Sequence, residues 1–419
     1  MLSFMQLAPL LIETFLGLLT DWVFWLVVVL VVMQYGRIAR SSRYLFDMPE
    51  FSSWQPALLA VLFGIAGGML GSVLLIITGI SILEVGIVYL WAAALILLLF
   101  RQRFLCFAYA GGAISLCRLL FGFPEVTVSQ VMGLVAVLHM VEAVLILTSG
   151  HLAAYPIYVR TKQGQVVGGF NLQKFWPLPL IALMALMIPE QEMLKGAVAM
   201  PDWWPLIKPE LLEGSGEPLY VLMPVVAALG YGDVALTSSP GKKARLAALE
   251  LAAFSVILLG LSVCASYYPW MALAPALFGP LGHEFIIWLD QRRESRGQPL
   301  YVQAERGVRI LYLHPGAPLA KAGLKSGDIL LSLQDYAVNN RYQIRAILLE
   351  AHGSLKAEYL PAKSREVRHT VIQRRGDEAL GFVAAPDRYE TSFLEMSGSA
   401  SLLKRGLEKI KGKMRQKNI

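Results

Sequence analysis

Ionisable side chains lie inside or at the edges of apolar runs in this chain, where they could carry proton or metal chemistry. His139 and Glu142 are three residues apart, so on a helix they would share a face. The others are Arg118, Asp233, Glu250, His283 and Glu284. Because a charge in hydrocarbon is costly, each could serve a proton relay, a ligand site or a metal site. The alternative, which we favour, is mutual pairing that locks the helices together.

Two of these segments can be compared with the zinc helix of intramembrane proteases. That chemistry needs H-E-x-x-H, which puts two imidazoles on one face with the Glu as general base. His283 and Glu284 are followed by Ile287 at the second ligand position. In 139–143, Ala143 stands where the inverted motif needs His. The chain also has no G-x-S-x-G nucleophile elbow. We therefore expect no catalytic residues, no cofactor and no enzyme activity.

The cysteines give no metal or disulfide pattern. All three fall in apolar runs, at Cys106, Cys117 and Cys264. Their spacing matches no zinc motif. We expect them to be small packing residues, and we expect no bound metal.

Composition places most of the chain in a membrane. Of 419 residues, 56% are hydrophobic and only 16% are charged, whereas a soluble domain is roughly half apolar and about a quarter charged. A helix needs about 17–25 apolar residues to cross the bilayer. Such runs predict a multi-span helical domain over 1–289 with nine to ten segments: 2–19, 22–36, 55–78, 85–100, 104–121, 131–149, 175–188, 219–237, 247–265 and 268–289.

The charges predict which side of the membrane each loop faces. Every second loop is basic, after the first, third, fifth, seventh and ninth main runs, whereas the intervening loop 189–218 is mostly acidic. Excess Lys and Arg mark the cytoplasmic side. The region 290–419 has a net charge of +9 against −2 for 1–289. We expect a cytoplasmic C-terminal region that can approach anionic lipid, with no nucleic-acid partner.

The hydrophobic pattern changes at Asp290. We expect a polar linker at 290–297, then a small α/β domain at 298–395 with strand-like and helical stretches in alternation. The tail 396–419 is basic, with apolar residues at three- and four-residue spacing. It could form an amphipathic helix on lipid or remain a disordered tail.

One motif in the α/β region resembles the centre of bacterial PDZ domains. The family pattern P-G-[AS]-P-A-x-x-A-G-L-x-x-G-D matches 315–328 nearly position by position, with Leu319 departing where the family more often has Ala. The structural residues of the motif are Gly316, Gly323, Leu324, Gly327 and Asp328. The glycines suit a turn and a helix end, and Gly-Asp suits a tight turn. The resemblance implies a domain that binds an extended peptide beside a helix.

The predicted peptide groove has one helix and two candidate strands. The helix is 340–350, which would offer Ile344, Ile347 and Leu348. The favoured strand is Pro299, Leu300, Tyr301 and Val302, because bacterial domains with permuted strand order place it before the central motif. The alternative is Leu380, Gly381 and Phe382, which resembles the carboxylate-binding loop of the other strand order. A closed groove whose residues are only core remains a further alternative.

A membrane part without protease motifs and one C-terminal PDZ-like domain resembles the MinJ family of cell-division topological determinants. GYGDVALT (230–237), KKAR (242–245) and ALFGPLGHE (276–284) add to that resemblance. It implies an adaptor at septum and poles that bridges a DivIVA-like scaffold to a MinD-like ATPase, beside other division membrane proteins. Rival hypotheses are a proton-coupled carrier with a regulatory PDZ domain, and a non-catalytic relative of a membrane protease.

Overall fold

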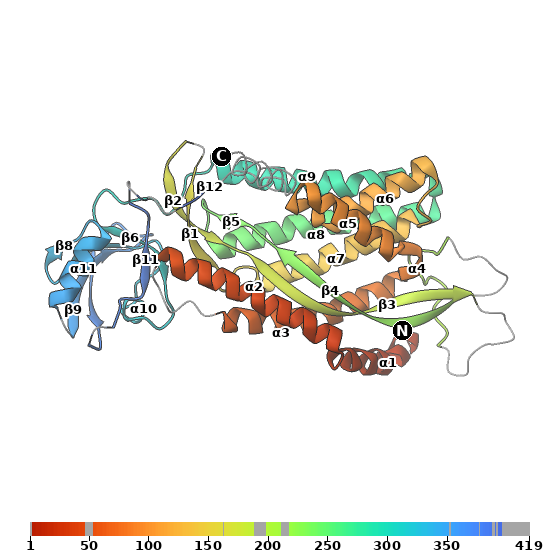
Figure 1. Ribbon diagram of the computed structural model, residues 1–419, viewed down its shortest axis with the longest axis horizontal. Coiled ribbons are helices and arrows are strands. Elements are labelled where there is room, and N and C mark those ends of the chain that lie inside the picture. The colour runs from red at the N-terminus through yellow and green to blue at the C-terminus, as the bar shows by residue number, and fades with distance from the viewer. Residues whose placement is uncertain are drawn as a thin grey trace, which may run out of the picture.

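The computed structural model describes residues 2–46, 53–161, 163–187, 198–210, 218–351, 353–376, 378–387, 390 and 393–395. Helices dominate up to residue 296 (Figure 1). They are α1 (Leu2–Leu19), α2 (Trp22–Phe46), α3 (Trp54–Thr78), α4 (Ile82–Val85), α5 (Ile87–Phe100), η1 (Gln102–Leu105), α6 (Phe107–Phe121), α7 (Val128–Ser149), α8 (Pro240–Tyr267), η3 (Pro269–Met271) and α9 (Leu273–Arg296). The strands among them are β1 (Tyr155–Arg160), β2 (Val166–Asn171), β3 (Lys174–Met187), β4 (Pro218–Tyr231) and β5 (Val234–Ala235).

Six helical segments of the described chain are long and apolar enough to cross a membrane. They are Trp22–Arg40, Trp54–Thr78, Ile82–Phe100, Val128–Ser149, Pro240–Tyr267 and Pro269–Arg296. Apolar side chains cover much of the outer surface of these helices, as expected where lipid is the solvent. With the C-terminal α/β unit described below, this confirms the predicted fold class, a helical membrane domain followed by a small α/β domain.

Two of the predicted helical spans are strands. β3 and β4 pair antiparallel over 14 residues each, from Lys174 opposite Tyr231 to Met187 opposite Pro218. In Figure 1 this β3–β4 hairpin runs diagonally across the helices. The prediction of helices at 175–188 and 219–237 is therefore wrong. Apolar composition is the same for a buried strand and a buried helix, so hydropathy did not separate them.

The edge of β3 that faces the helices has its backbone donors satisfied by side chains. In an antiparallel strand, alternate residues direct their N–H groups to the same edge. Three such groups donate to hydroxyls of α2, of α3 and of the residue before α4: Phe175 N to Tyr35 Oη at 3.3 Å, Ile181 N to Ser72 Oγ at 2.8 Å and Ala185 N to Ser81 Oγ at 3.0 Å. Without such partners an N–H buried in an apolar domain would cost several kcal/mol.

Prolines occupy two further positions of the same edge, and Leu183 forms a backbone bridge with Ser81. Pro177 and Pro179 are at odd-numbered positions, as the three donors are, so they face the same edge of β3. Proline has no backbone N–H that would need a hydrogen-bond acceptor there. Their carbonyl oxygens press on α3 so closely that a Cβ at Gly64 would lie 2.2 Å from Pro177 O, and one at Gly68 would lie 2.1 Å from Pro179 O. Small residues on α3 therefore let the strand backbone approach the helix, as they let helices approach one another in membranes.

The C-terminal unit, as the described residues show it, is a mixed α/β domain at one end of the molecule (Figure 1). Its elements are β6 (Val308–Leu313), α10 (Pro318–Lys321), β7 (Ile329–Leu333), β8 (Tyr336–Ala337), α11 (Arg341–Glu350), β9 (Ser354–Leu360), β10 (Arg368–Gln373) and β11 (Phe382–Ala384). The strand order is β10-β9-β7-β6-β11, with β8 paired to β7. Its own apolar core includes Ile310, Leu330 and Leu355, which are buried.

The junction with the membrane part differs from the predicted linker. Residues 290–296 continue α9 as a helix, so the expected polar linker at 290–297 is wrong. A second sheet, of order β12-β1-β2-β5, lies at this junction, and its β12 (Leu394–Glu395) comes from the end of the C-terminal unit. The predicted tail 396–419 lies outside the described residues.

The close approach of α3 and β3 makes a prediction. Gly68→Ala should lower the free energy of unfolding by about 1–3 kcal/mol, because the new Cβ would overlap Pro179 O. Gly260→Ala in α8 is the matched control, since nothing lies within 4 Å of a Cβ there, and it should be neutral or stabilising by up to about 1 kcal/mol. Thermal unfolding of both purified variants in detergent measures the difference. Equal melting temperatures would contradict the packing described for β3.

Candidate functional site

The candidate peptide site consists of an edge strand of the C-terminal sheet and a helix that pack on the same apolar core. β11 is the last strand in the order, so one of its edges has no strand partner within the described sheet. It pairs antiparallel with β6, with Phe382 opposite Leu313. The helix α11 begins after Asn340, whose side chain accepts a hydrogen bond from Gln343 N and caps the helix.

The loop before β11 requires glycine. Gly381 has φ of +68°, and a Cβ there would lie 2.3 Å from Ala317 Cβ. Its carbonyl accepts from His314 N at 2.8 Å, and Leu380 O accepts from Leu319 N at 3.4 Å. The loop is therefore fixed against the turn that carries the sequence motif.

The predicted helix residues and the alternative strand residues come together. Ile344 is 3% exposed and lies in the domain core. Ile347, Leu348 and Phe382 are half-buried and pack against that same core. An apolar wall beside an edge strand can accept an extended peptide as an added strand, with the wall selecting side chains.

The favoured segment 299–302 lies elsewhere, which corrects its predicted place in the groove. Tyr301 is 5% exposed, its carbonyl accepts from Gly168 N at 2.8 Å, and Leu300 N donates to Leu236 O at 2.9 Å. These contacts attach the segment to the β1–β2–β5 sheet at the junction. The prediction for 299–302 was wrong because the sequence allows either candidate strand to lie next to the motif. Only the strand pairing in three dimensions shows that 380–382 is the segment beside it.

The motif residues act as structural supports. Positive φ values of +83°, +91° and +96° occur at Gly316, Gly323 and Gly327. Asp328 is buried and accepts from Lys325 N at 2.8 Å and from Ala362 N at 2.9 Å. Together with buried Leu324, they hold the turns that lead into β7.

The membrane part reaches one end of the edge strand. Tyr158 of β1 donates its hydroxyl to Ala384 O at 2.8 Å. Burial raises the pKa of the Tyr158 phenol, and the nearby Glu390 carboxylate raises it further. Arg341 at the start of α11 forms an ion pair with Glu390 at 3.1 Å. These contacts occupy the Ala384 end of the strand. At the other end Leu380 is buried and Phe382 is half-buried.

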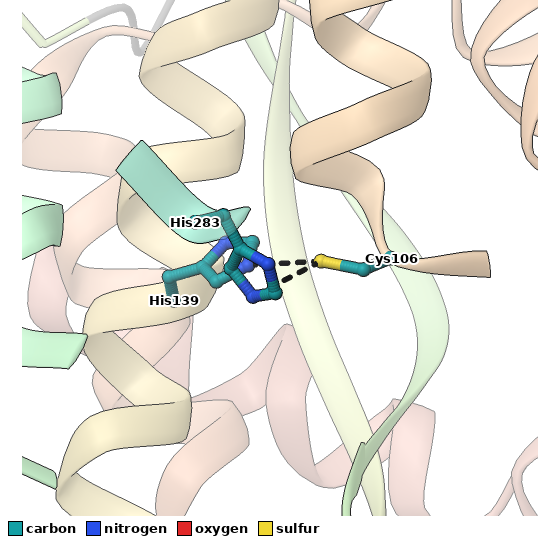
Figure 2. Close-up of side chains that lie close together, drawn as sticks. All are labelled: Cys106, His139 and His283. Atoms are coloured by element: carbon teal, nitrogen blue, oxygen red, sulfur yellow. Dashed lines mark hydrogen bonds between the residues drawn. The ribbon is translucent and has the colours of Figure 1, made fainter. Parts of the chain in front are cut away.

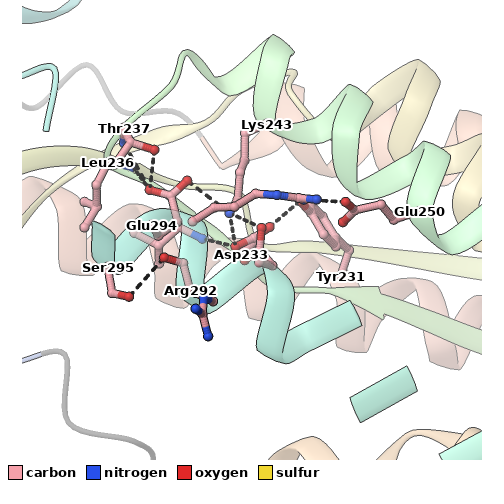
Figure 3. A network of polar contacts seen from close by, with 12 residues as sticks. Tyr231, Asp233, Leu236, Thr237, Lys243, Glu250, Arg292, Glu294 and Ser295 are labelled. Atoms are coloured by element: carbon pink, nitrogen blue, oxygen red, sulfur yellow. Dashed lines mark hydrogen bonds and ion pairs between the residues drawn. The ribbon is translucent and has the colours of Figure 1, made fainter. Parts of the chain in front are cut away.

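The charged residues flagged in the sequence near the C-terminal end of the helical domain are paired (Figure 3). Lys243 of α8 is 3% exposed and contacts Asp233 at 3.3 Å, Glu294 at 3.1 Å and Asp290. Tyr231, at the end of β4, also donates its hydroxyl to Asp233 at 3.0 Å. This Lys243 network ties the end of the β3–β4 hairpin to the start of α8 and the end of α9.

Two further ion pairs also join separate elements of the helical domain. Glu250 of α8 pairs with Arg293 of α9, and Glu284 pairs with Arg103 at 3.0 Å. Glu284 also accepts from Tyr109 Oη at 2.6 Å. Mutual pairing between helices is therefore what the structure shows for these acidic groups.

The two flagged histidines meet a residue that the sequence had assigned to packing. Cys106 Sγ lies 3.1 Å from His139 Nε2 and 3.7 Å from His283 Nε2. The three residues come from the start of α6, the middle of α7 and the middle of α9. Separations of 33 and 177 residues along the chain leave no spacing signal by which the sequence could have shown this cluster.

Fold and site together define a helical membrane protein that carries an α/β domain with an edge-strand groove. No family model matches the chain. It is similar to the cell division topological determinant MinJ of Bacillus subtilis, with 26% identity over 218 residues, which cover 51% of this chain and 50% of MinJ. The chain thus matches about half the length of that relative.

The Lys243 network makes a prediction about stability. Lys243→Met should lower the free energy of unfolding by about 3–5 kcal/mol, because three carboxylates would lose a buried cation. The neighbouring Lys242 is exposed, so Lys242→Met should change it by less than about 1 kcal/mol. Thermal unfolding in detergent compares them. A Lys243→Met variant as stable as the control would show that the network contributes nothing.

Proposed function

We propose that this protein is a membrane-anchored, non-enzymatic adaptor in division-site selection. The observation that carries the proposal is the edge strand β11 beside α11, on a domain joined to the membrane part by the continuous helix α9. The similarity to MinJ supports the cellular process. An anchor and a recognition groove are the two parts that an adaptor needs.

The groove is proposed to work as a PDZ-type site. An extended peptide would add antiparallel or parallel to β11, with its end at the loop Leu380–Phe382 and a side chain against Ile347 and Leu348. The supporting feature is the pairing of β11 with β6, together with the hydrogen bonds from His314 N to Gly381 O and from Leu319 N to Leu380 O. These contacts bring the motif at 315–328 next to the loop at 380–382.

The C-terminal unit is proposed to face the cytoplasm. The helix ends nearest to it carry the basic residues Arg37 and Arg40 of α2, Lys242 of α8, and Arg292 and Arg296 of α9. Positive loops remain on the cytoplasmic side, where they meet anionic lipid. The position of the protein at septum and poles belongs to the same proposal.

The proposed partners are a DivIVA-like polar scaffold and a MinD-like ATPase, with other division membrane proteins nearby. Partners held at one membrane gain effective concentration, so individually weak contacts suffice for a bridge. The rival hypothesis of a proton-coupled carrier rests on Glu142, His139 and Asp233. The ion pair of Asp233 with Lys243 favours the adaptor for that one residue, because a paired carboxylate stabilises the contact between elements.

Recruitment through the groove can be tested with neighbouring leucines of α11. Leu348 is half-buried against the apolar core of the C-terminal unit, whereas Leu349 is 75% exposed. Leu348→Asp should make a fluorescent MinD-like partner lose septal enrichment, because a carboxylate in the apolar wall costs more than about 1.4 kcal/mol, a tenfold loss of affinity. Leu349→Asp should leave enrichment unchanged.

Folding of the variants is checked by limited proteolysis of the C-terminal unit in membranes. Septal enrichment that persists in a proteolysis-resistant Leu348→Asp variant would contradict recruitment by this groove.

A further inference from the structure

We propose that Cys106, His139 and His283 form a zinc-binding site inside the helical domain. Figure 2 shows the Cys106 side chain directed at the two imidazole rings, which come from different helices. The ligand atoms of the three residues all lie within 4.8 Å of one another. One thiolate and two imidazoles are a ligand set that Zn²⁺ takes in proteins.

The distances fit a metal between the three atoms. Zinc bonds to sulfur at about 2.3 Å and to imidazole nitrogen at about 2.0–2.1 Å, so in a tetrahedron the two ligand atoms are about 3.5 Å apart. The separations of Cys106 Sγ from the two Nε2 atoms, 3.1 and 3.7 Å, lie on either side of that value. The two histidine nitrogens lie within 4.8 Å of each other, whereas a tetrahedral zinc would hold them about 3.3 Å apart. Metal binding would therefore draw the imidazole rings together.

The hydrogen bonds of the rings direct the correct nitrogen inward. His139 Nδ1 lies 2.7 Å from Val135 O. A carbonyl only accepts, so Nδ1 carries the hydrogen and the Nε2 lone pair faces Cys106. This carbonyl contact is the one that orients histidine ligands in metal proteins.

The second histidine has a polar support of its own. His283 Nδ1 lies 3.5 Å from Tyr109 Oη, which donates to Glu284 Oε2 at 2.6 Å. Glu284 is in turn held by Arg103 at 3.0 Å. The chain Arg103–Glu284–Tyr109 thus positions the His283 ring from behind, with its Nε2 toward the thiol.

The cluster is partly buried. His139 is 3% exposed, whereas Cys106 and His283 are half-buried. The Phe254 ring lies 5.5 Å from the His139 ring and 5.8 Å from the His283 ring. Burying two imidazoles and a thiol in an apolar domain is costly unless their lone pairs find a partner, and a metal supplies that partner.

Three protein ligands leave the fourth zinc position to water or to a carboxylate. Glu142 follows His139 by three residues on α7, so it lies on the same helical face. Bound zinc would join the start of α6 to α7 and α9, and α9 continues into the C-terminal unit. The bound metal would thereby stabilise the packing of α9, the helix that leads into the C-terminal unit.

The test measures metal in the full-length protein, purified in detergent with a tag that contains no histidine. Elemental analysis should find about one zinc per chain. Cys106→Ala and His283→Ala should each lower zinc content at least about tenfold. Cys117→Ala and Cys264→Ala are matched controls, because both cysteines are exposed and lie outside the cluster; they should keep the metal.

A second measurement covers variants that fold poorly. The wild-type protein, stripped with a chelator and loaded with Co²⁺, should show a thiolate-to-cobalt charge-transfer band that Cys117→Ala retains and Cys106→Ala lacks. A wild-type protein that holds no zinc after growth and purification with zinc would overturn the proposal. Zinc content unchanged in Cys106→Ala, or copper bound in place of zinc, would overturn it as well.

Discussion

The hydrogen-bond requirement of backbone groups in an apolar domain is the constraint on which this structure depends. Helices meet it within themselves, but the β3–β4 hairpin does not, because the edge of β3 that is not paired with β4 turns its donors toward α2, α3 and Ser81. The chain meets the requirement with hydroxyls of Tyr35, Ser72 and Ser81 and with prolines that have nothing to donate. The glycines of α3 allow the contact that brings these groups within reach.

Charged side chains in the helical domain also have partners, at the end of the domain that lies near the C-terminal unit. The Lys243 network joins β4, α8 and α9 where the hairpin ends. Because one cation is shared by three carboxylates, its geometry holds three elements in place at once. Beside it lie the β1–β2–β5 sheet, Tyr301 and β12, which fasten the C-terminal unit to the membrane part.

These attachments fix the position of the C-terminal unit of the proposed adaptor relative to the membrane part. The groove between β11 and α11 is presented on a unit that is attached by a continuous helix and by strand pairing, so a bound partner would be held at a defined distance from the membrane. Tyr158 reaches from the membrane part to Ala384 in the edge strand itself. The edge strand and the membrane part are therefore in direct contact, so the orientation of one depends on the other.

Much of this could be predicted from local patterns. Hydropathy located every apolar run that the structure places in the membrane part, the motif at 315–328 indicated the turns of the α/β unit, and apolar spacing located α11, because these signals depend on near neighbours in the chain.

Only the tertiary structure decided which apolar runs are strands, which of two segments borders the groove, and that Cys106 meets His139 and His283. Each of these depends on pairing between segments far apart in sequence, and a single sequence contains no record of such distances.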